Sequence, residues 1–534
     1  MDALHAPGSL RRPAGWAACA TADRAVGVTT TTRSPTTSGG TGSRTPHFLR
    51  IASAVRSEKN GLIMTAPFLS IVRTFAVPDQ NPQGPAKTSP RIEQPRFKGR
   101  SPFLCAWPEH RLAMVALSFL AASGWFLATH ARADAHWPQW RGPHANGSLT
   151  QGHYPAKWSA DQVRWKFELP GKGGSSPIVW NQSIFLATPA EGEDAILALD
   201  LEGKQRWIKK LGKESPPKHR TLGSSCNSTP ATDGRSIFAY FRSGRFVSLG
   251  LDGSVKWSQD LSARFGPEQL FWDQGSSPVL TEREVILARM HQGDSWVAGF
   301  DKVSGEMKWQ VKRNYKVPAE NDNGYTTPVF FEHRGRKAFA VWGADHLTAH
   351  SADDGKLLWS CGQFNPEGTG YWPAIASPIL TGQLAIVPVG RDDRPGQARV
   401  HAIRLDGAGD VSGSHRVWKR DDVGVFVATP VEFGGRVLLL RHRGEVVCLD
   451  PATGKTRWTG EFPRGTASYY ASPVVANGIL YAAREDGVVF SARVGDSFEF
   501  LGEQPMGERV LATPTPALDR LFIRGDKHLF CIAK

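Results

Sequence analysis

The chain of 534 residues contains only six cysteines, and no two of them are adjacent or spaced as Cys-x-x-Cys. This spacing excludes a Cys-x-x-Cys redox or metal motif and a haem-attachment site of the Cys-x-x-Cys-His type. The sequence also lacks Gly-x-Ser-x-Gly, P-loop and Rossmann fingerprints, and every His-x-His or His-Glu-x-x-His pattern. We therefore predict no catalytic residue and no metal-binding residue.

The cysteines in the second part of the chain are Cys226, Cys361, Cys448 and Cys531. Cys448 and Cys531 lie inside apolar strand patterns, VVCLD and LFCIA, which favours buried free thiols over ligands. A disulfide in an oxidising compartment is the alternative, and the spacing does not decide between the two.

The net charge of +14 is concentrated at the N-terminus, since residues 1–135 hold 16 Lys and Arg against 7 Asp and Glu. The nearly 400 residues that follow have a small positive excess and no basic stripe. Because a phosphate-binding groove needs clustered cations, we expect no nucleic-acid partner.

The N-terminal region divides into two segments by composition. Residues 1–110 are rich in Thr, Ser, Pro, Gly and Arg without an apolar period, and we interpret them as disordered or as translated from too early a start codon. Residues 111–135 have the layout of a cleavable signal peptide: Arg111, an apolar run from Met114 to Ala128, and Ala133-Asp134-Ala135. The prediction is an exported protein, periplasmic or extracellular, with no membrane span in its mature form; an uncleaved anchor is the alternative.

The remainder of the chain is an internal repeat. A Ser/Thr-Pro dipeptide followed by apolar residues recurs eight times, about 40–50 residues apart, at Pro177, Pro230, Pro278, Pro328, Pro378, Pro430, Pro473 and Pro514. Most units also contain a pattern close to LALD…GK..W, with short alternating strands between Gly, Asn and Asp turn signals. Strands at this period, without a helical pattern between them, predict an all-β propeller of eight four-stranded blades.

The two ends of the repeat predict how the ring closes. After Pro514 only three strands fit, whereas VRWKFEL, with Trp165, is a fourth strand without its own first three. We expect this N-terminal strand to complete the last blade, so that no edges remain unpaired there. The propeller would span residues 161–534, after a lead-in at 136–160. The large aromatic faces predicted to pack between blades are Trp165, Trp207, Trp257, Trp309, Trp359, Trp418 and Trp458.

The Asp-x-x-x-Gly-Lys-x-x-Trp repeat resembles the PQQ-like repeat of quinoprotein dehydrogenases and of BamB-type outer-membrane assembly lipoproteins, over roughly residues 137–534. The dehydrogenases hold PQQ with a vicinal Cys-Cys disulfide, a stacking Trp, and Glu, Asn and Asp on calcium. The chain has no adjacent cysteines and no Asp-x-Asp-x-Asp-Gly run. We therefore predict no cofactor, and PQQ with calcium is the alternative.

The loops that lead from one blade to the next converge around the axis of a propeller and are the place for a ligand. Aromatic and polar residues recur in these loops. The candidate ligand-binding residues are His219, Arg220, Trp272, Asp273, Asn321, Asp322, Asn323, Tyr325, Tyr371, Trp372, Tyr469 and Tyr470. The alternative is that they fill the wide central hole of an eight-bladed ring.

Three functions are compatible with these residues, because a fold does not determine a function. The first is an exported, monomeric, non-enzymatic scaffold that binds a protein, a peptide or a glycan. The second is a PQQ-dependent alcohol or sugar oxidoreductase with a diverged site. The third, suggested by the resemblance alone, is a BamB-like assembly factor; no lipobox cysteine follows the apolar run.

Overall fold

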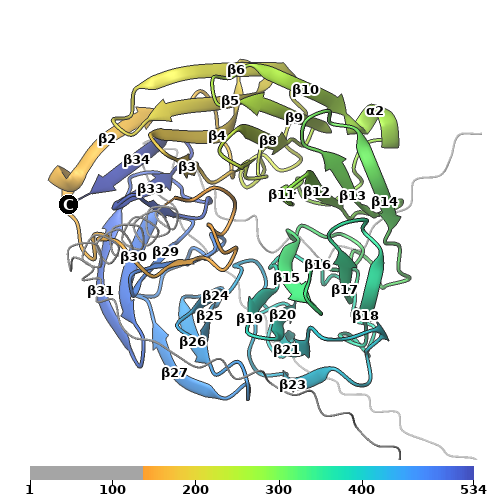
Figure 1. Ribbon diagram of the computed structural model, residues 1–534. Coiled ribbons are helices and arrows are strands. Elements are labelled where there is room, and N and C mark those ends of the chain that lie inside the picture. The colour runs from red at the N-terminus through yellow and green to blue at the C-terminus, as the bar shows by residue number, and fades with distance from the viewer. Residues whose placement is uncertain (1–135, 534) are drawn as a thin grey trace, which may run out of the picture. The chain divides into compact units, whose positions relative to one another are not determined.

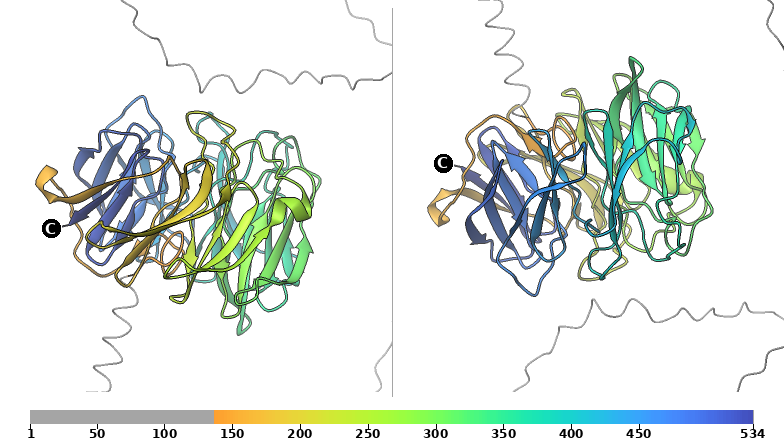
Figure 2. Two further views of the ribbon diagram at one scale, coloured as in Figure 1. Left: turned by 90° about the horizontal axis from the view of Figure 1, so that it is seen from above. Right: turned by 90° about the horizontal axis from the view of Figure 1, so that it is seen from below.

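The computed structural model describes residues 136–533, and these form a ring of eight antiparallel sheets (Figure 1). The prediction of an eight-bladed all-β propeller is confirmed. The predicted head at 1–110 and signal peptide at 111–135 lie outside the described residues. Figure 2 shows the ring from two further directions, with the sheets side by side around the axis.

Each blade contains four strands, numbered here from the axis outwards. Blades 1 to 4 consist of β3 (Ile178–Trp180), β4 (Ser183–Ala190), β5 (Glu193–Asp200) and β6 (Gln205–Lys213); β7 (Ala231–Thr232), β8 (Ser236–Tyr240), β9 (Arg245–Gly250) and β10 (Val255–Asp260); β11 (Val279–Leu280), β12 (Glu284–Arg289), β13 (Trp296–Asp301) and β14 (Met307–Lys312); and β15 (Val329–His333), β16 (Arg336–Gly343), β17 (His346–Ser351) and β18 (Leu357–Cys361).

Blades 5 to 8 consist of β19 (Ile379–Thr381), β20 (Leu384–Gly390), β21 (Ala398–Arg404) and β23 (Arg416–Arg420); β24 (Val431–Phe433), β25 (Arg436–Leu440), β26 (Glu445–Leu449) and β27 (Thr456–Glu461); β28 (Val474–Ala476), β29 (Ile479–Ala483), β30 (Val488–Val494) and β31 (Phe498–Pro505); and β32 (Thr515–Ala517), β33 (Arg520–Arg524), β34 (His528–Ala533) and β2 (Val163–Glu168). The short elements outside this scheme are β1 (Ser148–Leu149), β22 (Gly409–Asp410), α2 (Leu261–Phe265) and the 3-10 turn η2 (Ala160–Gln162).

The hydrophobic core is formed where the faces of neighbouring blades pack together. This packing determines which residues of each strand are buried. The two middle strands of a blade are buried on both faces, as in β5, whereas the outermost strands alternate in exposure, as in β2. Continuous apolar runs therefore mark the middle strands and alternating runs the outer ones. All four cysteines after residue 135 are buried and free, in agreement with the expectation for Cys448 and Cys531.

In seven of the eight blades the tryptophan of the outer strand lies against the next blade, whereas β31 of blade 7 has no tryptophan. The Nε1–H of Trp165 donates to the carbonyl of Leu201 at 2.8 Å, and a Cβ on Gly203 would approach the Trp165 ring to 2.5 Å. Gly203 also has a φ of 81°, so this turn needs glycine both for its backbone and for the approach of the ring. Trp207, Trp257, Trp359, Trp418 and Trp458 likewise donate to a carbonyl of the following blade. Trp309 packs on Gly355 of the next blade, but its indole N–H donates to Glu284 of its own blade.

The residues before seven of the eight repeat prolines link neighbouring blades near the axis. The backbone N–H of Ser176 donates to the Thr229 hydroxyl at 3.1 Å, and the N–H of Thr229 to the Ser277 hydroxyl at 3.0 Å. The same bond joins the pairs Ser277–Thr327, Thr327–Ser377, Ser377–Thr429 and Thr429–Ser472. The repeat therefore needs a hydroxyl at this position, because it satisfies a buried N–H that no strand pairs.

The N-terminal strand completes the last blade, as predicted. Strand β2 pairs antiparallel with β34, with Trp165 opposite Cys531 and Phe167 opposite Leu529. The ring is thus closed by hydrogen bonds between the first and the last parts of the propeller.

The lead-in at 136–160, for which the sequence predicted no structure, enters the ring. Its first part, residues 136–149, is called the axial segment here. It bonds to the innermost strands of four blades: Trp137 pairs with Val179, the Pro138 carbonyl accepts the N–H of Thr232, the Asn146 carbonyl accepts the N–H of Glu432, and β1 pairs in parallel with β28. Figure 1 shows this segment in orange, inside the ring.

One arginine of the axial segment connects two blades. The side chain of Arg141 is 1% exposed and donates to the carbonyls of Pro430 and Pro473, both at 2.6 Å. Burial lowers its pKa to about 9. The sequence left open whether loop side chains fill the central hole of the ring, and the axial segment occupies part of that space.

Candidate functional site

Many of the predicted ligand-binding residues hold the blade-connecting loops to one another. Asp273 accepts the backbone N–H groups of Lys218 at 2.9 Å and Ser224 at 3.1 Å, and forms an ion pair with Arg242 at 2.6 Å. Its buried carboxylate therefore joins the loop after blade 1 to the loop after blade 2.

The next loops are joined in the same way. The Asn323 side chain accepts the N–H of Phe271 at 2.9 Å, and the Tyr325 hydroxyl accepts the N–H of Trp272 at 2.9 Å. Desolvation by burial raises the pKa of Tyr325, so the phenol stays neutral.

The loop after blade 3 also contacts the loop after blade 4. Asn321, which is fully buried, accepts the N–H of Trp372 at 2.8 Å and donates to Asp345 at 3.0 Å. The indole N–H of Trp372 donates to Gln397 at 3.0 Å. These polar side chains satisfy loop backbone groups, and this use makes the face rigid.

The remaining candidates are spread over the face. The His219 ring lies 3.7 Å from the Trp272 ring, with Arg220 exposed beside it. Tyr371 is exposed at 38%, Asp322 is half-buried, Tyr469 is buried, and Tyr470 packs 5.7 Å from His442. The structure thus places the His219 ring beside Trp272, and hydrogen bonds join Tyr325 to Trp272 and Asn321 to Trp372. The other candidates are distributed over several loops.

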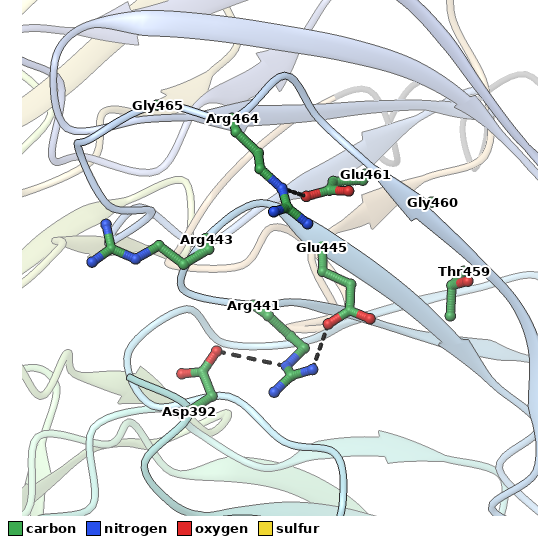
Figure 3. A pocket seen from close by; sticks show the side chains of 9 residues that line it. All are labelled: Asp392, Arg441, Arg443, Glu445, Thr459, Gly460, Glu461, Arg464 and Gly465. Atoms are coloured by element: carbon green, nitrogen blue, oxygen red, sulfur yellow. Dashed lines mark hydrogen bonds and ion pairs between the residues drawn. The ribbon is translucent and has the colours of Figure 1, made fainter. Parts of the chain in front are cut away.

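A cavity of about 670 Å³ lies on this face, and none of the predicted residues lines it (Figure 3). Its lining comes from the turn between β20 and β21, the turn between β25 and β26, and the end of β27 with the loop that follows. The lining residues are Asp392, Arg441, Arg443, Glu445, Thr459, Gly460, Glu461, Arg464 and Gly465. We call it the arginine cavity.

Charged groups in the arginine cavity are arranged in pairs. Arg441 forms an ion pair with Glu445, and Arg464 forms one with Glu461. The Nε of Arg441 also lies 4.0 Å from Asp392, whereas Arg443 donates to the carbonyl of Thr466 at 3.0 Å.

Asp392 is the buried group of the cavity, with its side chain 2% exposed. Its two oxygens accept the backbone N–H groups of Phe426 at 3.0 Å and His442 at 2.6 Å. Desolvation raises the pKa of Asp392 to about 6, although these N–H donors and Arg441 act in the opposite direction. A cavity with a perturbed carboxyl in its wall is a candidate binding site.

This site was missed because the sequence prediction considered only the loops between blades. The arginine cavity combines one such loop, after β27, with two turns between second and third strands inside blades. One feature of the sequence pointed to it: an arginine ends a second strand, as at Arg289 and Arg524, or directly follows one, as at Arg391, Arg441 and Arg484.

Residues 136–533 contain no group of three or more His, Cys, Asp or Glu side chains placed to hold a metal ion. Within the same residues, no helix has the length and apolar character needed to cross a membrane.

Solved structures with a similar fold share little sequence identity with this chain. Its fold resembles that of a europium-containing methanol dehydrogenase, with a TM-score of 0.57 and 12% identity over 74% of this chain and 90% of that one. It also resembles the quinohemoprotein alcohol dehydrogenase from Comamonas testosteroni, with a TM-score of 0.54 and 13% identity over 77% and 82% of the two chains.

In sequence, the chain is 21% identical over 376 residues to the outer membrane protein assembly factor BamB of Moranella endobia (strain PCIT), which covers 68% of this chain and 77% of the relative. The family model described as outer membrane protein assembly factor BamB matches residues 156–317, 222–377 and 398–496, together more than half of the chain. The PQQ-like repeat resemblance is thereby confirmed, and the chain belongs to the BamB family.

Proposed function

We propose that this protein is a non-enzymatic scaffold that binds a protein or peptide partner outside the cytoplasm. The observation that carries the proposal is the arginine cavity, a polar depression of about 670 Å³ on the face where the connecting loops meet. The loops around the face are cross-linked by buried side chains such as Asp273 and Asn321. A rigid face with a concave polar site binds a partner with little loss of conformational entropy.

Family membership supports one partner class in particular. The relative from Moranella endobia is named as an outer membrane protein assembly factor. A partner from the assembly of outer-membrane proteins is therefore the first candidate, and it requires the exported location that the sequence predicts.

The test is affinity capture of the full chain with photo-cross-linking from an envelope extract. We expect a partner that cross-links to the wild type and is lost in the double variant Arg441→Ala/Arg464→Ala. The control is Arg493→Ala, because Arg493 is an exposed arginine at the end of β30, on the opposite face. Equal capture by all three proteins, or no capture at all, would contradict the proposal.

The rival function, a PQQ-dependent oxidoreductase, has its own measurement. The purified protein is titrated with PQQ and calcium while absorbance and thermal unfolding are followed, and alcohols and sugars are then offered as substrates. Cofactor-dependent turnover would replace the scaffold proposal, whereas an unchanged spectrum and melting temperature would remove the rival.

A further inference from the structure

We propose that the arginine cavity recognises a carboxylate of a peptide, and that Arg443 is the residue that binds it. This inference rests on the proposed scaffold function and specifies the chemistry of its partner. Three observations support it: the composition of the lining, the pairing of its charges, and the hydrogen bonds that fix the turn on which Arg443 lies.

The lining selects a polar ligand. Among the lining residues, Thr459 offers the only methyl group, and the other side chains are arginines, carboxylates or glycines. Burial of apolar area therefore contributes little to the free energy of binding, and charge-assisted hydrogen bonds must supply most of it.

The pairing of the charges singles out one cation. Arg441 and Arg464 are engaged by Glu445 and Glu461. Arg443 differs from both, because its guanidinium donates to the carbonyl of Thr466 at 3.0 Å and, within residues 136–533, to no carboxylate. Figure 3 shows its side chain extending away from the two ion pairs. A guanidinium has five donors in a planar fork that matches a carboxylate, so most of them are available for a ligand.

The turn that carries Arg443 is held on both sides. The N–H of His442 donates to Asp392 at 2.6 Å, and the His442 ring contacts the Ser468 hydroxyl at 2.9 Å. On the other side, Gly444 bonds to Arg441 and Phe462 through its backbone. Because the turn is fixed before binding, less ordering entropy is lost when Arg443 takes up a ligand.

The size of the cavity favours a chain segment over a free ion. A space of about 670 Å³ is much larger than a single carboxylate and lies within the range of sites that take drug-sized ligands. The carboxylates of Glu445 and Glu461 are 40% and 44% exposed, and can accept backbone N–H groups of a bound chain. We infer a short peptide segment whose carboxylate lies on Arg443 and whose amides face these two glutamates.

The carboxylate can belong to an acidic side chain or to a chain terminus, and the experiment separates the two sources. Fluorescence anisotropy with the full chain uses three labelled peptides of the same Gly/Ser background. One has internal glutamates and capped ends, one has a free C-terminal carboxylate alone, and one is capped and uncharged. We expect one or both anionic peptides to bind and the uncharged peptide not to bind.

The variant that tests the residue is Arg443→Gln, with Arg493→Gln as the matched control. Arg443 is exposed, so the substitution leaves the fold intact, and circular dichroism confirms this for both proteins. We expect Arg443→Gln to weaken anionic-peptide binding about tenfold or more, and the control to leave it unchanged. Arg443→Glu should in addition bind a lysine-containing peptide of the same background better than the wild type does.

Two results would overturn the inference: anionic peptides that bind Arg443→Gln as well as the wild type, or no binding of either anionic peptide to the wild type. These outcomes are separate from the scaffold proposal. A partner captured from envelope extract that depends on Arg441 and Arg464 would still support the scaffold, while failure of the peptides removes only the ligand class.

Discussion

Closure of the ring by β2 can be tested through the tryptophan that docks it on blade 1. Trp165→Ala removes the hydrogen bond to Leu201, the ring contact with Gly203, and the packing against Phe522 at a centroid distance of 6.0 Å. Truncation of a core Trp to Ala costs about 3–5 kcal/mol, and Trp165 is only half-buried, which favours the lower end. The Leu201 carbonyl keeps the Arg520 guanidinium as a donor, so loss of the indole hydrogen bond adds at most about 1 kcal/mol. We expect a loss of about 3–4 kcal/mol in the free energy of unfolding.

The control is Trp257→Ala, which removes the same kind of contact, to Lys302 and Gly305, between blades 2 and 3 and away from the closure. Both variants should be destabilised in denaturant titrations, with the loss for Trp257 at least as large because that side chain is 9% exposed. Hydrogen exchange measured by mass spectrometry should then differ between them. Exchange should rise in β2 and β34 for Trp165→Ala, and in β10 and the β13–β14 turn for Trp257→Ala. A stability change below about 0.5 kcal/mol for Trp165→Ala, or unchanged exchange in β34, would refute closure by docking.

Three further changes test other parts of the fold. Burial raises the pKa of Asp194 from 3.8 to about 7, so its contribution to stability is full below pH 3.8 and is lost as the pH rises to about 7. Asp194→Asn keeps an acceptor for the Ser243 hydroxyl and cannot ionise. In urea titrations this variant should be more stable than the wild type at pH 8, by an amount on the order of a few kcal/mol, but not at pH 4. Arg141→Ala leaves two buried carbonyls without their donor and should cost about 2–5 kcal/mol, measured in the same titration; an unchanged midpoint would show that the axial segment contributes no stability. Thr327→Val keeps the shape but removes the acceptor for the N–H of Ser277, and should cost about 1–3 kcal/mol, whereas Thr327→Ser should restore most of it.

The ring was predictable because its signals are local and repeated. The Ser/Thr-Pro dipeptide recurs in all eight blades and the outer-strand tryptophan in seven, so the copies in register predict eight sheets. Closure followed from counting strands, since VRWKFEL had no partners of its own. The axial segment could not be predicted in this way, because it has no period and its bonds are distant in sequence, such as that from Arg141 to Pro473 across 332 positions.

The candidate site shows where inference from residue type fails. Asp273, Asn321 and Asn323 are polar loop residues of the kind that bind ligands, but their oxygens accept backbone N–H groups of neighbouring loops. Loops that cross one another in a ring have unpaired backbone donors, and short polar side chains are the nearest acceptors. The arginine cavity, by contrast, is formed by three turns that only the folded ring brings together.

The β2–β34 pairing that closes the ring and the arginine cavity lie in different blades. Substitutions at the two places should therefore affect stability and ligand binding separately. The two N-terminal strands, β1 and β2, pair with β28 and β34 in blades 7 and 8, so the ring cannot close before the last strand of the chain is present. Such long-range pairing is slow to form. The cavity instead rests on blades 5 and 6 and the loop after them, whose turns are held by Asp392. Trp165→Ala should therefore lower the unfolding midpoint while the folded fraction keeps its affinity for an anionic peptide. Arg443→Gln should weaken binding of that peptide and leave the unfolding midpoint unchanged. If both substitutions reduced binding and stability together, the face could not be treated as a preformed site on a rigid ring.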